Sequence, residues 1–207
     1  MMLSSAKSVV VLDFETTGLS PNQGDRAIEI GAVKLENGTV VDRFQSLMNP
    51  GFRVSGFIEN YTGISNAMLV NAPSCKDVMG EFSTFIQNSN LVAHNASFDK
   101  RFLDAELELI NESYTGEFAC SLLVSRRLNQ EAHSHKLGDL VAYHNIANDG
   151  IFHRALADAE VTASLWLLLV DSLTERFKIN DPSFALMQRL SKQPKASIAQ
   201  FLTKQAV

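Results

Sequence analysis

The amino-acid sequence predicts an α/β domain in which helices flank a mixed, five-stranded β-sheet that opens with an antiparallel meander. An unbroken apolar run, Val9 to Leu12, is typical of a strand that is buried on both faces. The tripeptide Glu36-Asn37-Gly38 lies between two strand-like segments and is a strong hairpin signal. Farther along, short apolar segments alternate with helix-like segments, and this order indicates a layered domain.

The first half of the chain supplies the meander and then a group of helices. Strands are expected to begin at Ser8, Ala27 and Thr39, and the last of them ends at Leu47. After an irregular stretch rich in glycine, apolar positions at helical spacing predict two short helices and one longer amphipathic helix, over residues 57–61, 66–69 and 74–87.

The second half alternates between short strands and helices. Strands are predicted over 90–94 and 117–120, and helices over 97–110, 121–128, 136–144 and 155–177. We expect Asn95 or Ser97 to cap the first of these helices and Ser134 to cap the third. The chain is expected to divide into a main domain, residues 1–178, and a short helical appendage, residues 179–207.

The composition is that of a globular protein, and it excludes some classes of function. Of the 207 residues, 45% are hydrophobic and 20% are charged, and the net charge of −5 argues against a large basic surface that wraps duplex nucleic acid. No apolar run approaches the roughly 18 residues that span a bilayer, so no membrane partner is expected. The two cysteines lack metal-site spacing, which favours a reducing, cytoplasmic compartment.

Asp13 and Glu15 follow the first apolar run and are the first candidate site residues. Because side chains alternate along a strand, these two carboxylates point the same way and Phe14 points the other way. Two carboxylates close together on one face repel each other. A divalent cation between them would relieve this repulsion, so the pair suggests a metal site at the end of a buried strand.

Asp99 and Asp158 each lie in the first turn of a predicted helix, on the same face as apolar residues. Taken alone, each acid is also explained by the helix dipole, which favours negative charge in a first turn. Together with Asp13 and Glu15 they make four acids at strand ends or helix starts. Hard oxygen ligands favour Mg²⁺ or Mn²⁺ over zinc, and two such ions can clamp the attacking and leaving oxygens of a phosphodiester.

Among the histidines, His153 is the candidate for proton transfer. It precedes the long C-terminal helix by two residues, and near a metal site it could take a proton from water at neutral pH. Taken alone, His153 is better explained as a surface loop residue. His94 ends a short buried strand and is expected to be a hydrogen-bonded structural residue. His133 and His135 are expected in a solvated loop, although His135 could lie near a substrate. Glu106 is expected to be an exposed helix acid.

Three segments carry a resemblance to a known family. LDFETTG, HNASFDKRFL and HRALADAEVT resemble the three exonuclease motifs of the DEDD superfamily, in their usual order and spacing. In its third motif the chain resembles the branch of this superfamily that has His, rather than Tyr, at the position of His153. The chain resembles, over about residues 8–172, the proofreading epsilon subunit of bacterial DNA polymerase III and its stand-alone relatives.

The resemblance implies a ribonuclease-H-like fold and a metal-dependent 3′-to-5′ exonuclease that releases nucleoside 5′-monophosphates from single-stranded or frayed DNA ends. It implies two divalent cations, Mg²⁺ or Mn²⁺. Asp13 would touch both ions, Glu15 and Asp158 would hold the ion that activates water, and Asp99 would hold the second. His153 would be the general base.

The resemblance also implies substrate contacts. They fall on two segments of this chain, one after the first strand and one in the irregular stretch: Thr16, Thr17, Leu19, Tyr61 and Ile64. For the second segment a structural turn around Gly63 explains the residues equally well.

Three interpretations of the whole chain stay open. The first is a DNA exonuclease in proofreading or repair, alone or as a subunit bound to a DNA polymerase. The second is an exoribonuclease of the same family that acts on RNA 3′ ends, since discrimination rests on contacts to the 2′-hydroxyl. The third is a polymerase-binding scaffold without activity, which the presence of all five motif residues argues against.

Overall fold

A five-stranded mixed sheet forms the centre of the molecule, as the sequence predicts. The computed structural model describes residues 4–148 and 153–205. In it, β1 (Val9–Thr16) pairs antiparallel with β2 (Ala27–Glu36), and β2 pairs antiparallel with β3 (Thr39–Leu47). On the other side of β1, β4 (Leu91–Ala93) and β5 (Phe118–Cys120) run parallel to it. The strand order is therefore β3-β2-β1-β4-β5, which leaves β1 paired on both sides.

The turn between β2 and β3 has the conformation that the sequence predicts. Asn37 and Gly38 are the two residues of the turn, and both have positive φ angles, 51° and 81°. Two consecutive positive φ values define a type I′ turn, whose twist matches that of the two strands it joins. Asn and Gly tolerate this conformation at low cost, so the dipeptide sets the register of the meander.

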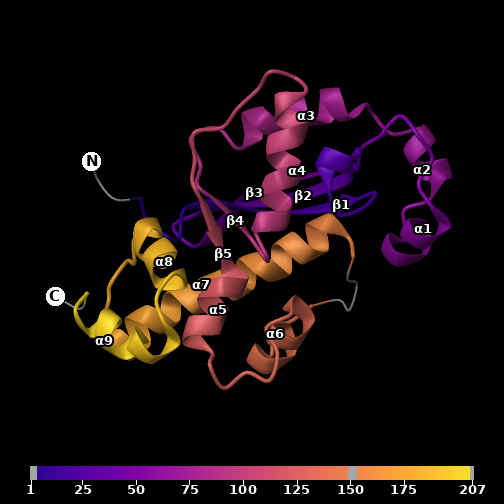
Figure 1. Ribbon diagram of the computed structural model, residues 1–207. Helices are drawn as coiled ribbons and strands as arrows, with labels where there is room; N and C mark the ends of the chain where they lie inside the picture. The colour runs from indigo at the N-terminus through magenta and orange to yellow at the C-terminus, as the bar shows by residue number, and fades with distance from the viewer. Residues whose placement is uncertain (1–3, 149–152, 206–207) are drawn as a thin grey trace.

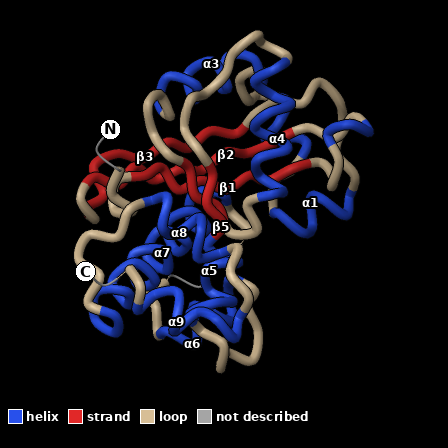
Figure 2. The backbone as a smooth tube through the Cα atoms, turned by 60° about the vertical axis from the view of Figure 1, so that its left-hand side comes forward, coloured by secondary structure: helices blue, strands red, loops and turns tan. Residues whose placement is uncertain are grey.

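Helices cover both faces of the sheet (Figures 1 and 2). One face packs against α3 (Cys75–Phe85) and α4 (Ser97–Glu108), and the other against the long helix α7 (Ala155–Phe177). Side-chain alternation in β1 serves both layers. Val10, Leu12 and Phe14 join the α3–α4 cluster, whereas Val9 and Val11 join the α7 cluster.

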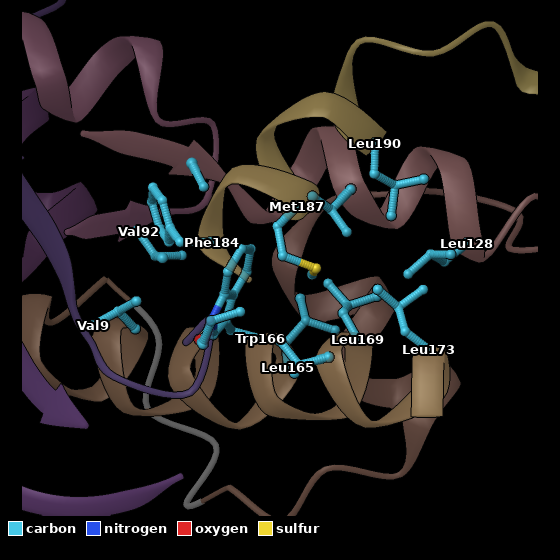
Figure 3. Close-up of a cluster of buried hydrophobic side chains, with 14 of the residues drawn as sticks. Val9, Val92, Leu128, Leu165, Trp166, Leu169, Leu173, Phe184, Met187 and Leu190 are labelled. Atoms are coloured by element: carbon cyan, nitrogen blue, oxygen red, sulfur yellow. The ribbon is translucent and has the colours of Figure 1, made fainter. Parts of the chain in front are cut away.

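The C-terminal helices belong to the same hydrophobic cluster as α7. This cluster gathers α5 (Ser121–Leu128), α6 (Leu137–His144), α8 (Phe184–Ser191) and α9 (Ile198–Thr203), the last preceded by the 3₁₀ turn η2 (Lys195–Ser197). Figure 3 shows Trp166 and Leu169 of α7 facing Phe184 and Met187 of α8. The indole Nε1 of Trp166 donates a hydrogen bond of 2.7 Å to the carbonyl of Ala6, which ties the N-terminal segment to this cluster.

A smaller hydrophobic cluster includes Ile28, near the start of β2, together with residues of α1 (Gly56–Thr62) and α2 (Asn66–Val70). The 3₁₀ turn η1 (Pro21–Gln23) lies between β1 and β2. Ser55 and Ser65 cap the two helices, since each side chain accepts a hydrogen bond from a backbone N–H of the first turn. No helix in the described residues is long and apolar enough to cross a membrane.

Two of the predicted helix caps are wrong. The residue at the start of α4 is Ala96, without a side-chain cap; Asn95, with a φ of 69°, makes the tight turn from β4, and its carbonyl accepts from Phe98 N. Helix α6 begins one residue later than predicted and also lacks a side-chain cap. There the Ser134 hydroxyl accepts a hydrogen bond only from the N–H of Lys136, before the helix.

The division of the chain at residue 178 stays a prediction, and a core substitution tests it. Met187 is fully buried in the cluster shared by α7 and α8. We expect Met187→Ala to lower the free energy of unfolding of the whole domain by about 2–5 kcal/mol, because it removes buried contacts and leaves a cavity. Urea unfolding followed by circular dichroism measures the effect.

The matched control is Leu168→Ala on α7, whose side chain is 42% exposed. We expect it to change the free energy of unfolding by no more than about 0.5 kcal/mol. An independent appendage would give a different result: Met187→Ala would leave the main urea-unfolding transition unchanged and would affect only a separate transition at lower urea concentration. Residues 179–207 would then unfold as a unit of their own.

Candidate active site

The end of β1 places Asp13 and Glu15 on one face of the sheet. In the antiparallel register Asp13 lies opposite Gly31 and Glu15 opposite Glu29, so all four positions share that face. Gly31 is a point of close approach, because a Cβ there would lie 2.1 Å from the backbone nitrogen of Leu156. The missing side chain therefore lets the first turn of α7 rest directly on β2, beside Asp13.

Asp99 reaches the same end of β1 from the neighbouring strand. Strand β4 runs parallel to β1, so the two strands finish at the same edge of the sheet, and α4 begins four residues after β4. The Asp99 side chain is 2% exposed, and its Oδ1 accepts a hydrogen bond of 3.2 Å from the backbone N–H of Phe14. This bond fixes the start of α4 between the positions of Asp13 and Glu15.

Asp158 and His153 come from the start of α7. The backbone N–H of His153 donates a hydrogen bond of 2.9 Å to Oδ2 of Asp158. Side-chain atoms of Glu15, His153 and Asp158 that can bind a metal all lie within 4.8 Å of one another. His153 has a φ of 64°, an uncommon left-handed conformation for a residue other than glycine, and such strain concentrates at functional sites.

Asp13, Glu15, His153 and Asp158 line a cavity of about 1000 Å³, whereas Asp99 is buried behind it. Four of the five predicted substrate-contact residues line it: Thr16, Thr17, Leu19 and Tyr61. The structure does not bring Ile64 to this cavity. Its side chain is fully buried in the cluster of α1 and α2, with Ile28 and Val54, so it supports the wall from behind.

One wall of the cavity is aromatic. The rings of Phe57 and Tyr61 are stacked, with centroids 5.9 Å apart and an interplanar angle of 10°, and they are 73% and 53% exposed. The Tyr61 ring also contacts the ring of His153, with centroids 4.3 Å apart. Lys136, which precedes α6 and is exposed, lies among the other lining residues.

The pKa values of the four carboxylates are all raised, and burial is the largest cause in each. Burial raises the pKa of Glu15 to about 8, with further increases from the charges of Asp158, Glu29 and Asp99. Burial also raises the pKa of Asp99 to about 7, and it raises those of Asp13 and Asp158. Within residues 4–148 and 153–205, no lysine or arginine forms an ion pair with any of these four carboxylates.

This set of residues fits a hard divalent cation. The donor atoms are carboxylate oxygens, with an imidazole beside them, and in the described part of the chain these carboxylates form no ion pair with a lysine or arginine. Oxygen ligands of this kind suit Mg²⁺ and Mn²⁺, whereas structural zinc sites use cysteine and histidine. The arrangement can therefore concentrate positive charge at the end of β1.

Glu29 and Arg154 are site residues that the sequence reasoning missed. Glu29 is fully buried and accepts hydrogen bonds from Arg154 Nε and Nη2 at 3.2 and 2.9 Å, from Ala155 N at 3.1 Å and from Gln45 Nε2 at 3.0 Å. A signal was present in the segment AIEIGAVKL, where a lone acid interrupts a buried apolar strand. Burying such a charge requires a partner, and Arg154 is that partner.

Glu106 is not the exposed helix acid that the sequence predicts. It is 2% exposed, and it accepts two hydrogen bonds of 2.8 Å from Arg26 and one of 3.0 Å from the N–H of Ala27. Helical spacing puts Glu106 on the same face as Phe102 and Leu103, which favours burial. The prediction failed because its buried partner, Arg26, lies 80 residues away in the sequence.

His94 is a structural histidine, as predicted. Its Nδ1 lies 2.9 Å from Ser121 Oγ, and its Nε2 lies 3.0 Å from the carbonyl of His135. Because a carbonyl only accepts, Nε2 carries the hydrogen and Nδ1 accepts from the serine. Burial lowers the pKa of His94 to about 4, so the ring is neutral near pH 7. His135 Nε2 in turn lies 3.1 Å from the carbonyl of Asn129.

Comparison with known proteins places the chain among exonucleases. The family model described as Exonuclease (RNase_T) matches residues 10–166. The chain is 37% identical over 166 residues to the PolC-type DNA polymerase III of Caldanaerobacter subterraneus subsp. tengcongensis, and 39% identical over 172 residues to that of Staphylococcus aureus. These alignments cover 80% and 83% of this chain. In each case it spans only 12% of the length of the relative.

Solved structures share the fold. Exonuclease X in complex with 5′ overhanging duplex DNA superposes with a TM-score of 0.69 at 24% identity, covering 88% of this chain and 99% of the other. The nuclease domain of 3′hExo, a DEDDh family member bound to rAMP, gives a TM-score of 0.64 at 21% identity, covering 82% and 92%. These matches confirm the predicted ribonuclease-H-like fold class.

The raised pKa values predict how stability depends on pH in the presence of EDTA. Between the unfolded pKa of Glu15, 4.5, and its folded pKa of about 8, the folded state holds a proton that the unfolded state releases. Stability therefore falls as pH rises through this window. His94 acts in the opposite sense, but only below its unfolded pKa of 6.5. We expect the midpoint of thermal unfolding to fall from pH 6.5 to pH 8.

The matched variant is Glu15→Gln, which removes the titrating group and keeps the shape of the side chain. We expect its midpoint of thermal unfolding to depend less steeply on pH than that of the natural protein. Equal slopes for the two proteins over pH 6.5 to 8 would contradict the assignment.

Proposed function

Because the chain belongs to the exonuclease family RNase_T, we propose that it is a 3′-to-5′ exonuclease that hydrolyses the terminal phosphodiester bond of single-stranded or frayed DNA and releases nucleoside 5′-monophosphates. One observation carries the proposal. Carboxylates from β1, α4 and α7 converge with His153 at one end of the sheet, although they come from sites up to 145 residues apart in the sequence, Asp13 and Asp158.

Two divalent cations, Mg²⁺ or Mn²⁺, complete the proposed site. Asp13 would touch both of them, with Glu15 and Asp158 on one and Asp99 on the other. The closeness of Glu15 to Asp158 and the separate anchoring of Asp99 on Phe14 N support this division. When bound, such cations supply charge neutralisation and lower the pKa of the attacking water.

His153 is the proposed general base. His153 is exposed and lines the cavity beside Glu15 and Asp158, so its ring can accept a proton from a water molecule at the reacting phosphate. The backbone bond from His153 to Asp158 fixes the position of this residue, and the contact with Tyr61 limits where its ring can lie.

The aromatic wall supports a single-stranded substrate. The bases of a single strand are free to stack on exposed aromatic rings, and such stacking is worth about 1–3 kcal/mol per base. Tyr61 and Phe57 offer two stacked, exposed rings next to the carboxylates. The backbone of the substrate would then pass Thr16, Thr17 and Leu19 on the rim that follows β1, while Lys136 offers a positive charge to a phosphate.

The relatives suggest the setting of this activity. Both are PolC-type DNA polymerases III, which favours DNA as the substrate and proofreading or repair as the role, with a DNA polymerase as the partner. The free thiols of Cys75 and Cys120 fit the cytoplasm, where such substrates are met. The alternative is an RNA 3′ end, which the rAMP bound to one structural neighbour favours.

A cleavage ladder tests the proposal. With 5′-labelled single-stranded DNA and Mg²⁺, we expect products shortened one nucleotide at a time from the 3′ end, and no cleavage in EDTA. RNA and duplex DNA in parallel reactions determine sugar and strand preference. Asp13→Asn should lower kcat by at least about 100-fold, since even outer residues of a metal site cost up to that much.

The matched control for Asp13→Asn is Asp104→Asn, an exposed acid on α4 that pairs with Lys100. We expect it to cleave at the rate of the natural protein. Full activity in a folded Asp13→Asn protein would sink the proposed mechanism, and a ladder that starts at the 5′ end would reverse the assigned polarity.

A second test addresses His153. We expect His153→Ala to lower kcat by about 10²–10⁴-fold, the usual contribution of a positioned base, while Mn²⁺ binding measured by calorimetry is largely kept. The pH–rate profile should lose its acidic limb, because that limb reports protonation of the base. An unchanged limb in the variant would assign the proton transfer to another group.

A further inference from the structure

Glu29 joins the start of α7 to the sheet through two separate contacts, one with the Arg154 side chain and one with the backbone N–H of Ala155. The two guanidinium contacts of 3.2 and 2.9 Å go to different oxygens of the Glu29 carboxylate, which is fully buried. One of these oxygens, Oε2, also accepts from the N–H of Ala155, the first residue of α7. Helix α7 has no side-chain cap of its own, so this strand residue satisfies its first N–H.

Arg154 also lies where its guanidinium could pair with Glu15 instead of Glu29. It lies next to His153 in the chain, and its partner Glu29 lies directly across the strands from Glu15. Burial is the main cause of the raised pKa of Glu15, and the guanidinium of Arg154 lowers it, so this cation is within electrostatic reach of the site. A guanidinium forms bidentate pairs with carboxylates and would compete with a divalent cation for Glu15.

We propose that Glu29 is a positioning residue that keeps Arg154 away from Glu15 and anchors the first turn of α7, so that the carboxylate site stays open to divalent cations. The inference rests on the proposed function, because it concerns the same metal-binding carboxylates. It assigns separate tasks to neighbouring acids on one face: Glu15 binds the cation, and Glu29 binds the arginine.

Two single variants and their combination test the proposal by Mn²⁺ binding, measured by isothermal titration calorimetry without substrate. Glu29→Gln keeps an acceptor for Ala155 N but loses the charge that retains Arg154. We expect its Mn²⁺ affinity to fall by about 10-fold or more. In Arg154→Met the competing cation is gone, so we expect Mn²⁺ affinity that is equal to or higher than that of the natural protein.

The double variant Glu29→Gln/Arg154→Met separates this role from a merely structural one. With no arginine left to divert, the loss of the Glu29 charge should matter little, and most of the Mn²⁺ affinity should return. A purely structural role predicts the reverse, since losing both members of the pair would loosen α7 at least as much as losing one. Circular dichroism shows that each variant is folded.

The chain offers a matched control in its second buried ion pair, between Arg26 and Glu106. The side chains of Glu106 and Glu29 are 3% and 0% exposed, and each accepts two guanidinium contacts and one backbone N–H. We expect Glu106→Gln to lower the midpoint of thermal unfolding and to leave Mn²⁺ affinity unchanged. A general loss of stability would then not explain weaker binding in Glu29→Gln.

Several outcomes would overturn the inference. They are natural Mn²⁺ affinity in Glu29→Gln, weaker binding in Arg154→Met, or a double variant that binds no better than Glu29→Gln. Failure of the proposed function looks different: the natural protein would then bind Mn²⁺ no better than Asp13→Asn does. If Glu29→Gln does not fold, the result for Arg154→Met still decides.

Discussion

Repulsion among carboxylates at the end of β1 is the constraint on which the rest of the site depends. Asp13, Glu15, Asp99 and Asp158 are held close together in partly or fully buried positions. Burial raises the pKa of each, and the charges of neighbouring acids raise those of Asp13 and Glu15 further. Left to themselves, flexible side chains would turn away from one another. The fold prevents this by placing each acid on a different rigid element, or on alternate positions of one strand.

Backbone atoms take part in several of these placements. Gly31 lets α7 touch β2, the N–H of Phe14 holds Asp99, and the N–H of His153 holds Asp158. Backbone donors have fixed positions, so Asp99 and Asp158 lose little freedom when a cation binds. The large clusters on both faces of the sheet supply the stability that offsets this local cost.

The sequence was sufficient to predict the elements and the convergence of the four acids, whose role as metal ligands stays a prediction, but not the contacts that position them. Strand β3 and helices α5 and α7 have the predicted bounds, because turn residues and helical periodicity are local signals. The roles of Glu29 and Glu106 depend on arginines 125 and 80 residues away in the chain, which no local pattern reveals. The burial of Ile64 was missed for the same reason, since its neighbours come from β2 as well as from its own segment.

Trp166 gives the molecule an internal optical reporter. It is the only tryptophan of the chain, it is fully buried, and the N-terminal segment, α7 and α8 all meet at its ring. It lies eight residues beyond Asp158 on α7, roughly 12 Å along the helix axis, and it does not line the cavity. Its fluorescence should therefore change when the N-terminal segment or α8 separates from α7, and should not change when a ligand binds in or leaves the cavity. A shift of its emission would then report unfolding rather than loss of a ligand from the site.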